Sequence, residues 1–94
     1  MKIVINASHG GFSLSHEALT LYNTLSGKSL IYCCDIERDD PHLVEVVESL
    51  GERAGGRHAD LHIVSIPEGV DWQIEEYDGK EWIAEKHRTW GLHD

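Results

Sequence analysis

A run of apolar residues at helical spacing in the middle of the chain is the strongest structural signal in the sequence. Its members stand at positions i, i+3, i+4, i+7 and i+11 and share one face of an α-helix: Leu43, Val46, Val47, Leu50 and Ala54. Asp40 suits the N-cap, and Pro41 suits the first helical position, where a missing N–H removes no hydrogen bond. The Gly55-Gly56 pair stops the pattern, so we predict a helix between residues 41 and 54.

Three segments before this helix have the patterns of a strand, a helix and a strand. Residues 2–6 form a β-branched apolar run that fits an interior strand. Either Ser13 or Ser15 can cap a helix that ends at Gly27 and has an apolar face at helical spacing: Leu14, Ala18, Leu21, Tyr22 and Leu25. Residues 29–34 are predicted as the second strand.

The last third of the chain is predicted to be β-structure. Residues 60–66 form the third strand. The sequences WQIEEY and KEWIAEK flank Asp78-Gly79, a dipeptide that readily adopts the positive φ angles of a two-residue type I′ turn. The predicted hairpin aligns two cross-strand pairs: Ile74 with Ile83, and Glu75 with Trp82.

The predicted order β-α-β-α-β-β-β describes a single α/β or α+β domain that spans residues 1–94. Alternating strands and helices followed by a hairpin imply a mixed sheet of about five strands covered by two helices. The tail, residues 87–94, has no place in this sheet, and we expect it to pack on its own subunit or on a neighbour. A monomer of 94 residues has only modest stability, so we expect a homo-oligomer.

The formal net charge of −9 limits the classes of partner. Proteins that bind duplex DNA or RNA without sequence preference present a basic face, so we expect no duplex nucleic acid partner. A small anionic ligand is compatible with this charge, because a local group of arginines can hold one inside an acidic envelope.

The cysteines and the apolar segments indicate a cytoplasmic protein. Cys33 and Cys34 are adjacent, and a disulfide between neighbours is strained, so we interpret them as buried thiols of a reducing compartment. The first residues, MKIVIN, lack the apolar core of a signal peptide. No segment approaches the roughly 20 apolar residues of a membrane span, so we expect no membrane contact.

The stretch SHGGFSLS, residues 8–15, is the first candidate binding element. Gly10 and Gly11 let backbone N–H groups approach a ligand, and the start of the following helix favours a phosphate or a carboxylate. His9 and Ser13 add side chains that can bond to it. The stretch lacks the GKS or GKT ending of a P-loop and the GxGxxG of a dinucleotide site, and an ordinary glycine turn explains it equally well.

Catalytic interpretations have less support in the sequence. The stretch GFSLS resembles the GxSxG nucleophile elbow, but Ser15 replaces its last glycine and the chain is short for a hydrolase sheet. The seven histidines show no metal-ligand spacing. The acidic residues of the hairpin flank an exposed turn and are interpreted as a solvated face: Glu75, Glu76, Asp78 and Glu81. We predict no catalytic residue, no metal site and no cofactor.

The chain has only eight Lys and Arg residues, and four of them are Arg53, Arg57, Lys86 and Arg88. In EKHRTW an arginine stands near a tryptophan, and such a pair can hold a nucleotide by forked bonds to phosphate and by stacking on the base. The alternative is an ordinary surface cation that lies along Trp90.

Three stretches resemble a family of small proteins encoded widely in bacteriophage genomes. They are the opening KIVINxxxGGFxLS, the helix LVEVVExLGE and the closing IPxGVDWxIEEYDGxEWIAEKHRTW. The resemblance covers nearly the whole chain, with the least agreement in residues 16–36. The chain departs from the family at Ser8 and His9, where the family has Cys-Tyr.

The family in turn is similar to phage sponges, oligomeric proteins that bind cyclic dinucleotides or related nucleotide immune signals and keep host antiphage effectors silent. This resemblance implies an anti-defence protein that sequesters a nucleotide without cleaving it. One wall of its site would comprise Gly10, Gly11, Phe12 and Ser13. Phosphate bonds and stacking would come from Arg57, His87, Arg88 and Trp90. A small hydrolase or nuclease, and an acidic inhibitor of a host protein, are the alternatives.

Overall fold

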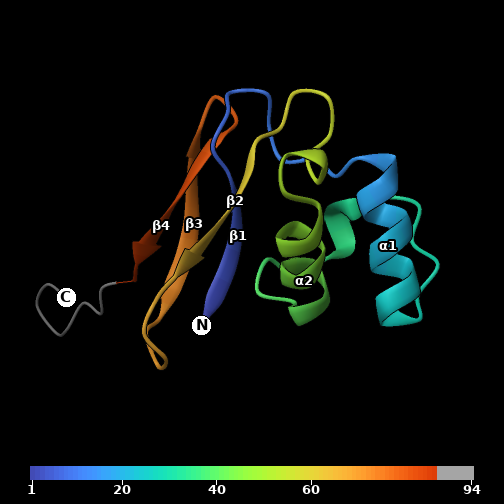
Figure 1. Cartoon of the computed structure of the whole chain (residues 1–94). Coiled ribbons are helices and arrows are strands. Elements are labelled where there is room, and N and C mark those ends of the chain that lie inside the picture. The colour runs from blue at the N-terminus through green and yellow to red at the C-terminus, as the bar shows by residue number, and fades with distance from the viewer. Residues whose placement is uncertain (87–94) are drawn as a thin grey trace, which may run out of the picture.

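The structure of the chain is a computed structural model that describes residues 1–86 (Figure 1). The described part has two α-helices and four strands: β1 (Lys2–Asn6), α1 (His16–Ser26), α2 (Pro41–Leu50), β2 (Leu61–Ser65), β3 (Trp72–Tyr77) and β4 (Lys80–Glu85). Two single-turn 3₁₀ helices flank α2: η1 (Cys33–Asp35) and η2 (Gly51–Arg53). This is a small α+β architecture with two helices, as the sequence predicts.

The four strands form two antiparallel pairs. β1 pairs with β2, with Val4 opposite Ile63, and β3 pairs with β4. Figure 1 shows the strands on one side of the molecule and the two helices on the other, with α2 against β1 and β2. β4 lies next to β1. The predicted mixed sheet is therefore corrected to two antiparallel pairs in the described part of the chain.

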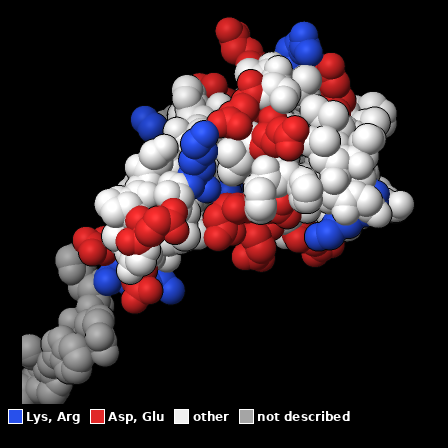
Figure 2. All heavy atoms as spheres, turned by 60° about the horizontal axis from the view of Figure 1, so that its bottom comes forward, with Lys and Arg blue, Asp and Glu red and all other residues white. Residues whose placement is uncertain are grey.

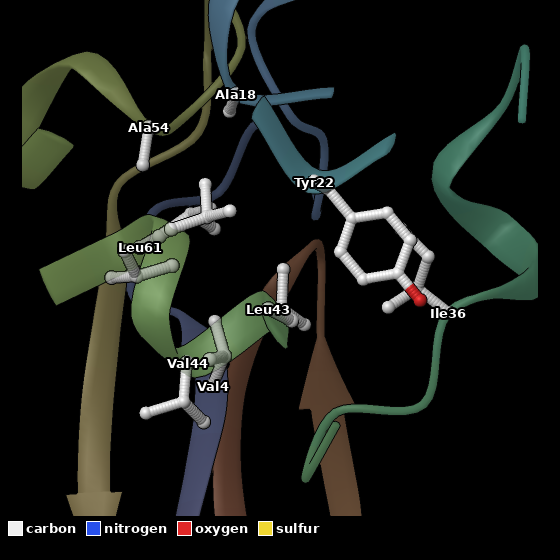
Figure 3. Close-up of a cluster of buried hydrophobic side chains, with 10 residues drawn as sticks. Val4, Ala18, Tyr22, Ile36, Leu43, Val44, Ala54 and Leu61 are labelled. Carbon is white, nitrogen blue, oxygen red and sulfur yellow. The ribbon is translucent and has the colours of Figure 1, made fainter. Parts of the chain in front are cut away.

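The hydrophobic core lies between the helices and the β1–β2 pair, as Figure 3 shows. Its buried members come from every layer: Val4, Ala18, Tyr22, Ile36, Leu43, Val44, Val46, Val47, Ala54 and Leu61. Tyr22 is fully buried, and its hydroxyl donates a 2.7 Å hydrogen bond to Asp40 Oδ2. Asp40 is also the N-cap of α2, because its Oδ1 accepts the backbone N–H of His42 at 2.8 Å. This carboxylate therefore ties the two helices together.

The predicted helix termini are confirmed with one change. Ser15, the second of the two proposed caps, accepts the N–H of Ala18 at 3.0 Å and begins α1. Gly27 ends α1 in the left-handed region at φ 75°. α2 ends earlier than predicted, at Leu50, because Gly51 adopts φ 56° and starts η2. Ala54 remains in the core, although it lies beyond the helix.

The predicted strand at 29–34 is wrong. Residues 33–35 form η1, and the side chain of Asn23 bonds to both the N–H and the C=O of Leu30, at 3.0 Å and 2.9 Å. The free edge of β1 is bonded instead by Arg38, whose backbone carbonyl accepts the N–H of Val4 at 2.8 Å. Ile31 and Tyr32 are consequently exposed, at 77% and 72%. Cys34 is also exposed, which corrects its interpretation as a buried thiol.

The predicted β3–β4 hairpin is confirmed in its turn and its register. Asp78 and Gly79 both adopt positive φ, 52° and 89°, as a type I′ turn requires. Ile74 lies opposite Ile83 and Glu75 opposite Trp82. The turn sets these pairs, because a two-residue loop fixes which residues of the two strands face each other.

Candidate functional site

Three loops meet at the end of the molecule that is uppermost in Figure 1. They comprise residues 8–13, residues 55–60 and the hairpin turn 78–79, and we call them the loop cluster. Backbone hydrogen bonds join the first two, since the N–H of Gly56 donates to Ser13 O at 3.0 Å. A β-bridge between Leu14 and Gly55 continues this pairing. The sequence-predicted glycine stretch thus lies beside the loop that carries Arg57.

The glycines of the loop cluster allow its chains to pack closely. A Cβ on Gly10 would overlap the backbone carbonyl and the side chain of His58. A Cβ on Gly79 would lie 2.5 Å from His9 O and 2.6 Å from Gly11 N. Gly11 has φ 87° and open space beside it. At Gly10 and Gly79 the lack of a side chain therefore serves chain packing, whereas Gly11 faces an open side.

Asn6 is fully buried at the end of β1 and holds the three loops together. Its Nδ2 donates to the carbonyls of Ser8 and Gly79, both at 2.8 Å. Its Oδ1 accepts the N–H of Asp60 at 2.8 Å. One amide side chain thus bonds to each loop, and such buried polar groups fix geometry because an unmade bond there is expensive.

An ion pair between the partly buried Arg38 and the buried Glu81 anchors the hairpin beside β1. The guanidinium donates two hydrogen bonds, Nη1 to Oε1 at 2.6 Å and Nη2 to Oε2 at 2.8 Å. Glu81 Oε1 also accepts the backbone N–H of Asn6 at 2.8 Å. The interpretation of Glu81 as part of a solvated face is therefore wrong, since its side chain is 8% exposed.

Burial raises the pKa of Glu81, but the hydrogen bonds from Arg38 and from the N–H of Asn6 outweigh it and hold the pKa below its ordinary value. The carboxylate is therefore ionised at neutral pH. The sequence carries one signal for this pair. Glu81 stands two residues before Ile83, on the same inward side of the hairpin as the Ile74–Ile83 pair, and an inward acid requires a cation.

Phe12 is occupied by a contact within the chain. The Arg38 guanidinium lies 3.6 Å from the centroid of its ring, in cation–π geometry. The ring also packs against the core. The face of Phe12 that Arg38 covers is not available to stack on a ligand, so Phe12 ties the glycine stretch to the core.

The loop cluster exposes one cation, two histidines and two acids, Asp60 and Asp78. His9, Arg57 and His58 are all exposed. His9 Nδ1 lies 3.3 Å from the backbone carbonyl of Asp78 and 3.9 Å from its carboxylate. Arg53, by contrast, pairs with Glu17 at 3.4 Å. The structure brings together the predicted residues 9–13 and 57, and His87, Arg88 and Trp90 lie outside the described residues.

The first turn of α1 does not directly follow the glycines of the loop cluster. α1 begins at His16, with residues 12–15 between Gly11 and the helix. The hydroxyl of Ser15 takes the N–H of Ala18 and donates to Arg53 O at 2.7 Å. The helix terminus therefore has its own cap, and the backbone groups near a ligand would be those of the glycine stretch.

Surface hollows in the described part of the chain lie elsewhere. One of about 500 Å³ separates β2 from the hairpin and is lined mainly by apolar side chains: Val64, Ile66, Pro67, Val70, Trp72, Ile83 and Glu85. Two others lie beside α1 and beside the N-terminus. Within residues 1–86, no group of three or more His, Cys, Asp or Glu side chains is placed to hold a metal ion.

Acidic side chains are spread over the face shown in Figure 2, which includes the bottom of Figure 1, and the basic ones there are isolated. In residues 1–86 no helix has the length and apolar character needed to cross a membrane. No protein-family model, no curated protein and no solved structure matches the chain.

Proposed function

We propose that this protein binds a small anionic nucleotide of the cyclic dinucleotide class and sequesters it without cleaving it, as a phage anti-defence protein in the host cytoplasm. The resemblance of its opening and closing motifs to the phage family supports the class of ligand. The loop cluster supports the place where the ligand binds.

The observation that carries the proposal is the contact between the glycine stretch and the loop of Arg57. This contact groups His9, Arg57 and His58 at one end of a chain whose net charge is −9. Guanidinium and imidazole donors with nearby glycine N–H groups suit phosphate oxygens. The two acids of the loop cluster, Asp60 and Asp78, lie 3.1 Å from His62 and 3.9 Å from His9. An anion is therefore expected to bind at this end.

The support for a hydrolase is smaller. The hydroxyl of Ser13 makes no hydrogen bond to a histidine within the described residues, and its Oγ instead packs against Gly56. A serine nucleophile needs a base within hydrogen-bond reach. Sequestration without cleavage needs no nucleophile and no base, because binding requires only hydrogen-bond donors held in place.

Arg88 and Trp90 enter this proposal through a second copy of the chain. Lys86 donates its N–H to Asp71 O at 2.9 Å, at the end of the hairpin farthest from Gly79. A six-residue strand such as β4 spans about 20 Å, whereas four residues of extended chain reach at most about 14 Å. We therefore assign Arg88 and Trp90, which lie outside the described residues, to the nucleotide site of a neighbouring copy.

Release of the ligand tests the proposal directly. The full chain is incubated with a panel of cyclic dinucleotides, freed of unbound nucleotide, denatured by heat and centrifuged, and the supernatant is analysed by mass spectrometry. We expect unaltered nucleotide in the supernatant. A hydrolysed product would contradict sequestration, and the absence of any bound nucleotide would contradict the ligand class.

A pair of arginine variants tests the site. Arg57→Ala is expected to weaken binding by about 1.5 to 3 kcal/mol in calorimetry, the range for a hydrogen bond to a charged group. Arg53→Ala removes an equal charge from a position where the guanidinium already pairs with Glu17, so it is the matched control. Equal effects of the two variants would assign the binding energy to net charge alone.

A further inference from the structure

β2 has an outer edge whose backbone groups are unpaired in the described part of the chain. The N–H of Ala7 donates to Asp60 O and the N–H of Ile66 donates to Met1 O, both at 2.8 Å, so the even-numbered residues from 60 to 66 face β1. Leu61, Ile63 and Ser65 therefore point their N–H and C=O groups away from β1. No residue within 1–86 bonds to these groups.

β2 itself carries no charged residue and no proline, two features that protect sheet edges from pairing with other chains. Its sequence, LHIVS, contains no Lys, Arg, Asp, Glu or Pro. β3, the edge strand of the other pair, carries Glu75 and Glu76. The outer edge of β1 is already bonded by Arg38 and Glu81. β2 is thus the strand of the described chain that is best suited to accept another strand.

We propose that two copies of this chain pair antiparallel along β2, with Ile63 of one copy opposite Ile63 of the other. This register is self-complementary, because the same edge serves both copies about a two-fold axis. It aligns all three outward residues, with Leu61 of each copy opposite Ser65 of the other. A register centred on Val64 would instead bring Leu61 opposite Pro67, which has no N–H to donate, and is disfavoured.

The dimer joins opposite ends of the two copies. Leu61 begins β2 beside the loop cluster, whereas Ser65 ends it near the hollow that Glu85 lines. Antiparallel pairing therefore brings the Glu85 end of one copy to the loop cluster of the other. If the proposed function holds, each dimer has two nucleotide sites, one at each loop cluster.

Sedimentation of the full chain without any nucleotide tests the pairing. We expect a concentration-dependent monomer–dimer equilibrium. Ser65→Pro removes an outward N–H from each copy, and so two hydrogen bonds from the dimer, and is expected to weaken it about tenfold or more. Ser65→Ala keeps the N–H and is the matched control. A monomer at all concentrations, or equal dimerisation of both variants, would overturn the proposal.

Amide hydrogen exchange identifies the edge without any substitution. The amides of Ile63 and Ser65 are expected to gain protection as the protein concentration rises. The amide of Ile74 points outward from β3 and is expected to stay unchanged, which makes it the internal control. Protection at Ile74 and not at Ile63 would place the interface on the hairpin instead. Because no ligand is present, failure of this test is distinct from failure of nucleotide binding.

Discussion

Arg38 and Glu81, 43 positions apart in the chain, form a two-bond ion pair that joins the segment before α2 to β4. The same guanidinium covers Phe12 and donates to the backbone carbonyl of Val4 at 3.3 Å. A single arginine thus connects β1, the glycine stretch and the hairpin. The pair thus holds the hairpin beside β1.

Removal of Arg38 is expected to destabilise the fold strongly. Arg38→Met leaves the buried Glu81 without its cation, and such a change typically costs about 3 to 5 kcal/mol. Chemical denaturation of the variant measures this loss. The double variant with Glu81→Met is expected to recover part of the stability, because no unpaired charge remains. Arg53→Met, at an exposed pair, is expected to change the free energy of unfolding by less than about 1 kcal/mol.

Acid is expected to weaken the fold through Glu81. Its folded-state pKa lies below the ordinary value of 4.5, so the carboxylate stabilises the fold above that pH. This stabilisation is lost as the pH falls through the folded-state pKa. Glu81→Gln does not titrate, so its free energy of unfolding is expected to fall less than that of the wild type between about pH 6 and pH 3. Equal slopes for the two proteins in urea denaturation would contradict the assignment.

The bond between Tyr22 and Asp40 makes a second prediction about stability. Burial and the neighbouring Asp40 carboxylate raise the pKa of Tyr22 to about 12. Tyr22→Phe keeps the ring but removes a hydrogen bond to a charged group, so it is expected to cost about 1.5 to 3 kcal/mol in thermal or chemical denaturation. Thr24→Val, which removes an exposed hydroxyl from the same helix, is the control. A cost no larger than that of the control would show that the bond contributes nothing.

Two neighbouring glycines are expected to respond differently to alanine. Gly10→Ala forces a Cβ into the His58 backbone and is expected to cost about 1 to 3 kcal/mol. Gly11→Ala meets open space and is limited to the strain of a positive φ, about 1 kcal/mol. The free energies of unfolding of the two variants decide between loop packing and backbone strain. A larger loss at Gly11 would contradict the packing described for the loop cluster.

Local patterns predict much of this fold, because caps and turns are decided by neighbours in sequence. Ser15, Gly27, Asp40 and the Asp78-Gly79 turn act where the sequence places them. Residues 29–34 have the composition of a strand, yet Arg38 bonds to the edge that they would have filled. Such a competition between distant segments leaves no local pattern.

The candidate site, like the fold, is predicted where it depends on neighbours in sequence and missed where it depends on contacts between distant segments. The glycine stretch is visible in the sequence, but its closeness to Arg57 depends on the Ser13–Gly56 pairing across the chain. The sequence does not indicate a role for Arg38, because its surroundings, DIERDDPH, have the pattern of a turn that leads into a helix. The one sequence signal for the Arg38–Glu81 pair is the register of the hairpin, which directs the Glu81 side chain inward, where a carboxylate needs a cation.

Mixing two inactive variants is expected to restore nucleotide binding if one copy supplies Arg57 and the other supplies Arg88. Arg57→Ala and Arg88→Ala are each expected to bind a fluorescent cyclic di-AMP, or whichever cyclic dinucleotide the wild type retains, much more weakly than the wild type. In an equimolar mixture, half of the dimers contain both variants, and each of these has one site with both arginines intact. About one quarter of all sites therefore recovers wild-type affinity.

Two outcomes decide whether the site is shared through β2. Recovery that disappears when both chains also carry Ser65→Pro would assign the shared site to the β2 dimer. No recovery in the mixture would contradict a shared site, because both arginines would then belong to one chain or one of them would lie outside the site.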